Sequence, residues 1–76
     1  MSNREKIVKV LQTVTNNQDL PADEDSLFDA GYLDSFALTE VVSELEKEFG
    51  IRIPDSDLNP GRFESIARIV EYVAKK

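Results

Sequence analysis

The sequence predicts an all-α fold: a small bundle of three main helices and one short helix, with a long first loop. Apolar residues recur at helical spacing in three separate stretches, and each stretch follows a residue type that caps helices. Only residues 51–54 alternate like a strand, and the sequence offers no partner strand. With 76 residues, 41% of them hydrophobic, the chain can bury one small core. We therefore expect a single domain over residues 1–76.

The first helix is expected from about Asn3 to about Thr15. Ser2, with Glu5 three residues later, has the spacing of a capping box, in which each side chain satisfies a backbone N–H of the other. Four apolar residues follow at helical spacing: Ile7, Val10, Leu11 and Val14. The Thr15-Asn16-Asn17 segment ends this helix.

A long loop separates the first two helices and runs to Asp34. Its acidic run, Asp23-Glu24-Asp25, lacks the ligand alternation and final glutamate of a calcium-binding EF-hand, so we expect a solvated acidic loop and no metal site. A loop of this length is typically functional or disordered, and apolar anchors favour order. The expected anchors are Leu20, Leu27, Phe28 and Leu33.

The second helix is expected from Ser35 to Phe49. Asp34 is a favourable N-cap, because its carboxylate can accept from free N–H groups of the first turn, and Gly50 can take the left-handed conformation that closes a helix. Phe36 falls on the outward face, an exposed aromatic beside a helix-start serine. The core-facing residues are Leu38, Val41, Val42, Leu45 and Phe49. Glu40, Ser43 and Lys47 share the outward face, with Glu44 at its edge.

After Gly50 the chain is expected to form an extended connector, Ile51-Arg52-Ile53-Pro54, whose isoleucines face the core. Residues 55–58 form the short third helix as a single turn, and Asn59-Pro60-Gly61 ends it. Ser65 caps the last helix. Its apolar positions are Ile66, Ile69, Val70 and Val73.

Composition limits the possible functions. Fifteen acidic and nine basic residues give a formal net charge of −6, which argues against binding nucleic acid and favours partners with basic surfaces. Cysteine and histidine are absent, so disulfides, thiolate or imidazole metal sites and the commonest general base are excluded. No apolar run has the length of a signal or membrane segment. We expect a cytoplasmic monomer without membrane insertion.

The segment Leu27-Phe28-Asp29-Ala30-Gly31-Tyr32-Leu33-Asp34-Ser35-Phe36 resembles the acyl carrier protein family. The resemblance covers nearly the whole chain and continues at Glu40, Leu45, Glu46, Phe49-Gly50-Ile51 and Ile53-Pro54. It implies that Ser35 is esterified with 4'-phosphopantetheine, whose thiol carries an acyl or aminoacyl group as a thioester. It also implies three kinds of partner: a phosphopantetheinyl transferase, a loading ligase, and a downstream synthase or acyltransferase.

Each candidate site residue also has a simpler interpretation. Ser35 could be an ordinary first-turn serine, and Asp34 is expected both to cap the helix and to help the transferase engage. Phe36 is interpreted as an exposed docking contact, with a core position under the loop as the alternative. Glu40 and Glu44 are assigned to docking, although acids on such a face are more often simply solvated.

The chain departs from the common fatty-acid carrier pattern at Phe36, Ala37, Ser43 and Lys47, and it is similar to D-alanyl carriers and to stand-alone carriers of specialised biosynthesis. The pathway therefore stays open among fatty-acid, polyketide or peptide synthesis and D-alanylation. Three phenylalanines and three isoleucines are expected around the interior, which favours a short or polar cargo. These residues are Phe28, Phe49, Ile53, Phe63, Ile66 and Ile69.

The expected role is that of a substrate and shuttle, not an enzyme. The alternative from another class is an acidic helical adaptor that binds a basic partner without modification. Independent hydrolase activity of Ser35 is the weakest hypothesis, because no histidine is available and no lysine is placed to act as its base.

Overall fold

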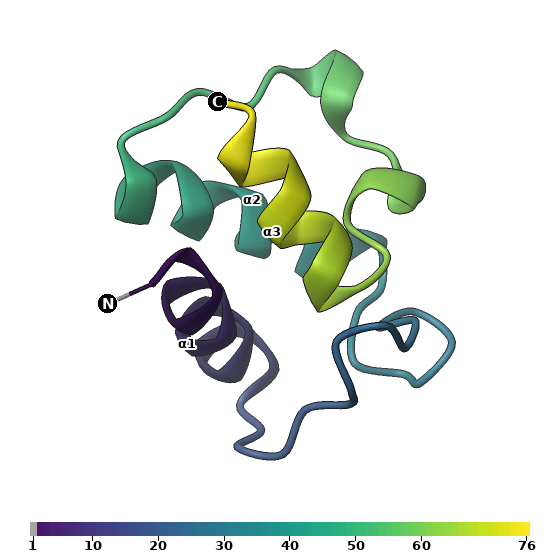
Figure 1. Cartoon of the computed structure of the whole chain (residues 1–76). Helices are drawn as coiled ribbons and strands as arrows, with labels where there is room; N and C mark the ends of the chain where they lie inside the picture. Colours follow the sequence, from purple (N-terminus) through teal and green to yellow (C-terminus); the bar gives the residue numbers. More distant parts are fainter. Residues whose placement is uncertain (1) are drawn as a thin grey trace.

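The computed structural model describes residues 2–76, apart from the side chain of Pro60. The three expected α-helices are present, and the described residues contain no strand (Figure 1). The all-α prediction is therefore confirmed. The elements in order are α1 (Asn3–Thr15), α2 (Ser35–Phe49), the short 3-10 helices η1 (Asp55–Asp57) and η2 (Pro60–Arg62), and α3 (Ile66–Ala74).

Local capping explains why the helix bounds follow from sequence. Ser2 Oγ accepts a hydrogen bond from the Glu5 N–H at 3.2 Å, and the Glu5 carboxylate accepts one from the Ser2 N–H, which completes the predicted capping box. Gly50 has φ +62° and its N–H donates to the Glu46 carbonyl, so it closes α2 as expected. Ser65 Oγ accepts from the Arg68 N–H at 3.2 Å and starts α3.

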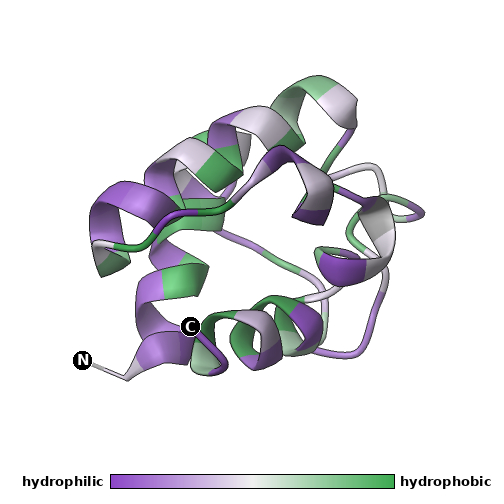
Figure 2. Cartoon of the chain, turned by 90° about the horizontal axis from the view of Figure 1, so that it is seen from above, coloured by the Kyte–Doolittle hydropathy of each residue, from purple (hydrophilic) through white to green (hydrophobic). Residues whose placement is uncertain are grey.

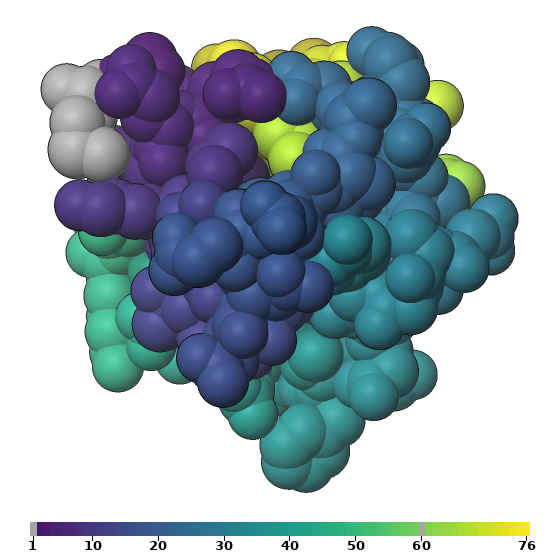
Figure 3. Space-filling model, turned by 90° about the horizontal axis from the view of Figure 1, so that it is seen from below, coloured from purple at the N-terminus to yellow at the C-terminus, as the bar shows by residue number. Residues whose placement is uncertain are grey.

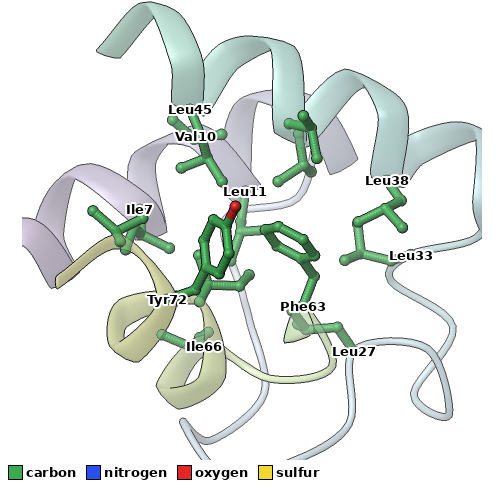
Figure 4. Packing of buried hydrophobic residues seen from close by; sticks show 14 of the residues in the cluster. Ile7, Val10, Leu11, Leu27, Leu33, Leu38, Leu45, Phe63, Ile66 and Tyr72 are labelled. Atoms are coloured by element: carbon green, nitrogen blue, oxygen red, sulfur yellow. The ribbon is translucent and has the colours of Figure 1, made fainter. Parts of the chain in front are cut away.

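Helix α1 is the centre of the packing, because it contacts both α2 and α3, which approach each other less closely. Each of the three helices carries both hydrophobic and hydrophilic residues along its length (Figure 2). The rings of Phe63 and Tyr72 lie among the aliphatic side chains of the core, with their centroids 5.1 Å apart (Figure 4). The space between α2 and α3 is thus filled by side chains from the segment before α3 and from α3 itself.

Two of the three phenylalanines expected around the interior lie at its edge. Phe28 and Phe49 are only partly buried, whereas Phe63 is fully buried. Phe49 is the last residue of α2, and the Lys6 ammonium lies 5.5 Å from the centroid of its ring. Tyr72, which the sequence analysis did not assign to the core, is 9% exposed and packs against Phe63.

The first loop is anchored to the segment that begins α3. Leu27 is fully buried, and its N–H donates to the Glu64 carbonyl at 2.6 Å. The Ala67 N–H donates to the Asp23 carbonyl at 3.0 Å, so two backbone hydrogen bonds join these segments. The loop covers one face of the molecule, between α1 and the start of α2 (Figure 3). The prediction that Leu20, Leu27, Phe28 and Leu33 pin the loop is confirmed, with Leu20 and Phe28 only partly buried.

An exposed ion pair also connects the acidic run to α1. The Arg4 guanidinium donates to both carboxylate oxygens of Asp23, each at 2.7 Å. This contact lowers the pKa of the Asp23 carboxyl from its ordinary value, mainly through the hydrogen bond. Exposed pairs of this kind contribute little stability, so the buried anchors hold the loop.

The connector after α2 is held by two side chains. The Glu46 carboxylate accepts from the Ile53 N–H at 2.8 Å, and Ile53 is buried as predicted while Ile51 is only partly so. The Asp57 carboxylate accepts from the Tyr72 hydroxyl at 2.5 Å, which ties η1 to α3.

The sequence predicted that Asn59-Pro60-Gly61 only ends the short turn. In the structure the chain forms a second 3-10 helix there, η2. Asn59 Oδ1 accepts from the Arg62 N–H at 3.1 Å. The asparagine therefore initiates another turn instead of only ending the first one.

The Tyr72–Asp57 hydrogen bond has a defined pH window. It lowers the pKa of the Asp57 carboxyl below its ordinary 3.8. Burial, together with the same hydrogen bond, raises the pKa of the Tyr72 hydroxyl above its ordinary 10.0. The stabilisation from this hydrogen bond is therefore complete between pH 3.8 and pH 10.0. The stabilisation is lost as the pH falls through the lowered pKa of Asp57 or rises through the raised pKa of Tyr72.

We predict that Tyr72→Phe lowers the melting temperature by a few degrees at neutral pH, because the hydrogen bond to a charged acceptor is removed while the ring is kept. The difference in melting temperature between this variant and the natural chain should become smaller below pH 3.8 and above pH 10.0. Calorimetry across this range is the measurement. A difference in melting temperature that is the same at every pH would contradict the pH window assigned to the Tyr72–Asp57 hydrogen bond.

Candidate functional site

The start of α2 presents free hydrogen-bond donors to solvent. Asp34 has extended backbone geometry, and its Oδ1 accepts from the Ala37 N–H at 2.8 Å, so the predicted cap is present. The Asp34 carbonyl accepts from the Leu38 N–H at 2.9 Å. Within residues 2–76, the N–H groups of Ser35 and Phe36 have no hydrogen-bond partner. These two donors lie at the positive end of the α2 dipole.

Ser35 is the first residue of α2, and it is exposed. Its Oγ makes no hydrogen bond to any of the described residues, whereas its carbonyl accepts from Thr39 Oγ1 at 3.2 Å. The hydroxyl therefore has no hydrogen-bonded base within this part of the chain, and it cannot be activated as the serine of a hydrolase is. It is accessible to a base from another protein.

The backbone that leads to Ser35 is fixed from the buried side. Gly31 has φ +83°, a conformation that favours glycine, and its N–H donates to the Phe28 carbonyl at 3.1 Å. The N–H groups of Tyr32 and Leu33 both donate to the Leu27 carbonyl, at 2.9 and 3.1 Å. Leu33 is 5% exposed. A buried anchor thus stands two residues before the exposed serine.

These residues fit a phosphate ester on Ser35. An accessible hydroxyl provides the attachment atom, and the two free N–H groups beside it are suited to an anion. No acidic residue follows in the first turn of α2, which limits like-charge repulsion to the Asp34 cap. The chemistry of the donors therefore matches a phosphodiester-linked group.

The outer face of α2, defined here as Phe36, Glu40, Ser43, Glu44 and Lys47, begins beside Ser35. Phe36 is 78% exposed, the only large hydrophobic residue so exposed among the described residues, which confirms its predicted outward direction. Glu44 lies 3.7 Å from the Lys47 ammonium, whereas Glu40 has no ion pair within the described residues. Of the two acids predicted for docking, Glu40 therefore offers the free charge, and that of Glu44 is partly compensated.

The described residues contain no cluster of three or more carboxylates that could hold a metal ion, and none of their helices is long and apolar enough to cross a membrane. Sequence reasoning placed Ser35, Asp34 and Phe36 at the helix start, but it missed the contact that positions them, between Leu27 and Glu64. Those two residues are far apart in sequence, and neither carries a local signal for the other.

Comparison with known proteins gives a consistent result. The sequence model described as "Phosphopantetheine attachment site" matches residues 5–73. A D-alanyl carrier protein of Leuconostoc mesenteroides subsp. mesenteroides is 32% identical over 73 residues, which cover 96% of this chain and 94% of that protein. A D-alanyl carrier protein of Streptococcus sanguinis is 45% identical over 53 residues, which cover 70% of this chain and 66% of that protein.

We predict that Phe36→Ala changes the free energy of unfolding by less than about 1 kcal/mol, because the ring is exposed. The matched control is Phe63→Ala, where loss of a fully buried ring should cost about 3–5 kcal/mol. Urea unfolding of both variants is the measurement. A large loss of stability in Phe36→Ala would mean that its ring packs against the protein in solution.

Proposed function

This chain belongs to the family of phosphopantetheine-binding carrier proteins, which are carriers and not enzymes, and on that premise we propose that Ser35 is the attachment residue of the 4'-phosphopantetheine arm. The observation that carries the proposal is the exposed Ser35 hydroxyl at the start of α2, beside two free N–H groups. The arm supplies a thiol that holds the cargo as a thioester.

The chain's own residues have limited chemical roles in this proposal. Ser35 Oγ is the nucleophile that forms the bond to phosphorus, and its proton passes to a base of the transferase while the nucleotide part of coenzyme A leaves. Asp34 holds the first turn of α2 in place and is the residue we propose the transferase recognises. The N–H groups of Ser35 and Phe36 favour the negative charge of the phosphodiester.

We further propose that the cargo is an aminoacyl group or another short acyl group. The relatives compared above are D-alanyl carrier proteins, which supports an aminoacyl cargo. Phe63, Ile66 and Ile69 are fully or almost fully buried in the core, so a long chain would have to displace well-packed side chains. Amide chemical shifts test this: large shifts at these core residues with an octanoyl cargo but not with an acetyl cargo would contradict it.

The partners we propose are a phosphopantetheinyl transferase, a ligase that loads the cargo, and a downstream synthase or acyltransferase. Each would meet the outer face of α2, with Phe36 as an apolar anchor and Glu40 as the charged contact. The alternative is an unmodified acidic adaptor that binds a basic partner through the same face. Family membership favours the carrier role, and modification by a transferase distinguishes the two.

The first functional prediction is that the chain gains the mass of one arm when it is incubated with coenzyme A and a broad-specificity phosphopantetheinyl transferase, and that Ser35→Ala does not. Ser56→Ala, at an exposed serine in η1 outside the outer face of α2, is the matched control and should be modified normally. Intact-mass spectrometry and a circular dichroism spectrum of each variant are the measurements. An arm on Ser35→Ala would place the attachment elsewhere, and an unmodified natural chain would favour the adaptor.

The second functional prediction separates the two acids of the outer face. Glu40→Gln should slow attachment of the arm severalfold at low ionic strength, because an exposed charge that meets a partner mainly affects the association rate. Glu44→Gln should have a smaller effect, because Lys47 already compensates Glu44. Initial rates at two salt concentrations are the measurement. Equal effects of both substitutions would show that the ion pair does not decide the docking contact.

A further inference from the structure

A second charged region, basic although the chain as a whole is acidic, lies within the last 15 residues. Four of the nine basic residues fall within residues 62–76, where only two acidic residues accompany them, although the whole chain has a net charge of −6. The positive charge of this protein is therefore concentrated at its C-terminal end. The four are Arg62, Arg68, Lys75 and Lys76.

Three of these cations line one pocket between η2 and α3. The pocket has a volume of about 160 Å³ and is lined by Gly61, Arg62, Arg68, Glu71, Tyr72 and Lys75. One face of α3 carries Arg68, Glu71 and Tyr72, with Lys75 at the C-cap that follows, and η2 packs against α3. Two elements therefore direct cationic side chains to the same small space.

The charges in this pocket are only partly compensated. Lys75 lies 3.5 Å from the Glu71 carboxylate, so these two side chains form an ion pair. Arg62 and Arg68 have no ion pair and no side-chain hydrogen bond within the described residues. The charge of Arg62 helps to lower the pKa of Asp57, but the Asp57 carboxylate already accepts from the Tyr72 hydroxyl and lies 3.6 Å from the Lys76 ammonium. Two guanidinium groups thus remain available to an outside anion.

We propose that this pocket binds a phosphoryl group, either as free phosphate or as a phosphate monoester. Guanidinium groups match phosphate oxygens with paired, charge-assisted hydrogen bonds, which favours phosphate over a single carboxylate. The pocket is well below the roughly 300–1,000 Å³ of sites for drug-sized ligands, so it suits one compact anion and not an extended polymer. Because the chain as a whole repels anions, a local concentration of positive charge is needed to offset that repulsion, and the arginines of this pocket provide it. The site does not depend on the arm at Ser35.

The test is a titration of the ¹⁵N-labelled natural chain, without the arm, at constant ionic strength. Inorganic phosphate and phenyl phosphate are the two probes, and acetate is the control anion. We expect saturable shifts of the amides of residues 61–62 and 68–75 with phosphate, and much smaller shifts with acetate. Binding of phenyl phosphate as well as inorganic phosphate identifies a monoester as an acceptable source, and binding of inorganic phosphate alone restricts the source to the free ion. Shifts that do not saturate, or that are equal with acetate, would overturn the proposal.

Variants locate the site. Arg62→Gln and Arg68→Gln should each weaken phosphate binding by about tenfold or more, since each removes hydrogen bonds between charged groups. Arg68→Lys keeps the charge but loses the planar fork, so it should bind with intermediate affinity. Arg52→Gln, an exposed arginine on the connector outside this pocket, is the matched control and should bind as the natural chain does. All three positions are exposed, and circular dichroism checks that each of the four variants folds. Undiminished phosphate binding in both glutamine variants would contradict the proposed site.

Discussion

The backbone hydrogen bond from the Leu27 N–H to the Glu64 carbonyl is the contact on which the placement of the site depends. It lies between two segments that have no helical ladder of their own, and the Leu27 side chain is fully buried beneath them. The Leu27 carbonyl then receives the N–H groups of Tyr32 and Leu33. One residue thus holds the middle of the first loop against the segment before α3 and also receives the end of that loop, next to Asp34.

The two faces of α2, which begins where this anchored loop ends, have different roles. The inner face of the helix contributes to the core that α1 and α3 share, whereas the outer face exposes Phe36 and the charge of Glu40, which has no ion pair within residues 2–76. Ser35 is the first residue of α2, where the loop joins the helix. The proposed attachment at Ser35 needs a nucleophile that a partner can reach but that does not react by itself, and an exposed hydroxyl with no hydrogen-bonded base among the described residues meets both conditions.

Features set by local rules could be predicted from the sequence. The Ser2, Asp34 and Ser65 caps and the end of α2 at Gly50 depend on residues within one turn, so the helix bounds followed from residue type and spacing. The outward direction of Phe36 followed from helical periodicity in the same way.

Features set by distant contacts could not be predicted. Arg4 and Asp23, Leu27 and Glu64, and Asp57 and Tyr72 meet only because the bundle brings them together. No pattern in one segment indicates its partner in another. The partial exposure of Phe49 has a similar cause, because periodicity gives the face of a helix but not how far the neighbouring helices extend along it.

Amide hydrogen exchange of the natural chain tests most directly the claim that an anchored loop positions Ser35. We expect the Leu27, Tyr32 and Leu33 amides to be protected as strongly as the amides of α2 around Val41, because opening them requires loss of the core. The amide of the exposed Glu24, in the same loop, provides the comparison for a weakly protected position. Exchange at Leu27 as fast as at Glu24 would show that the loop is not anchored, and would contradict the account of how the site is held.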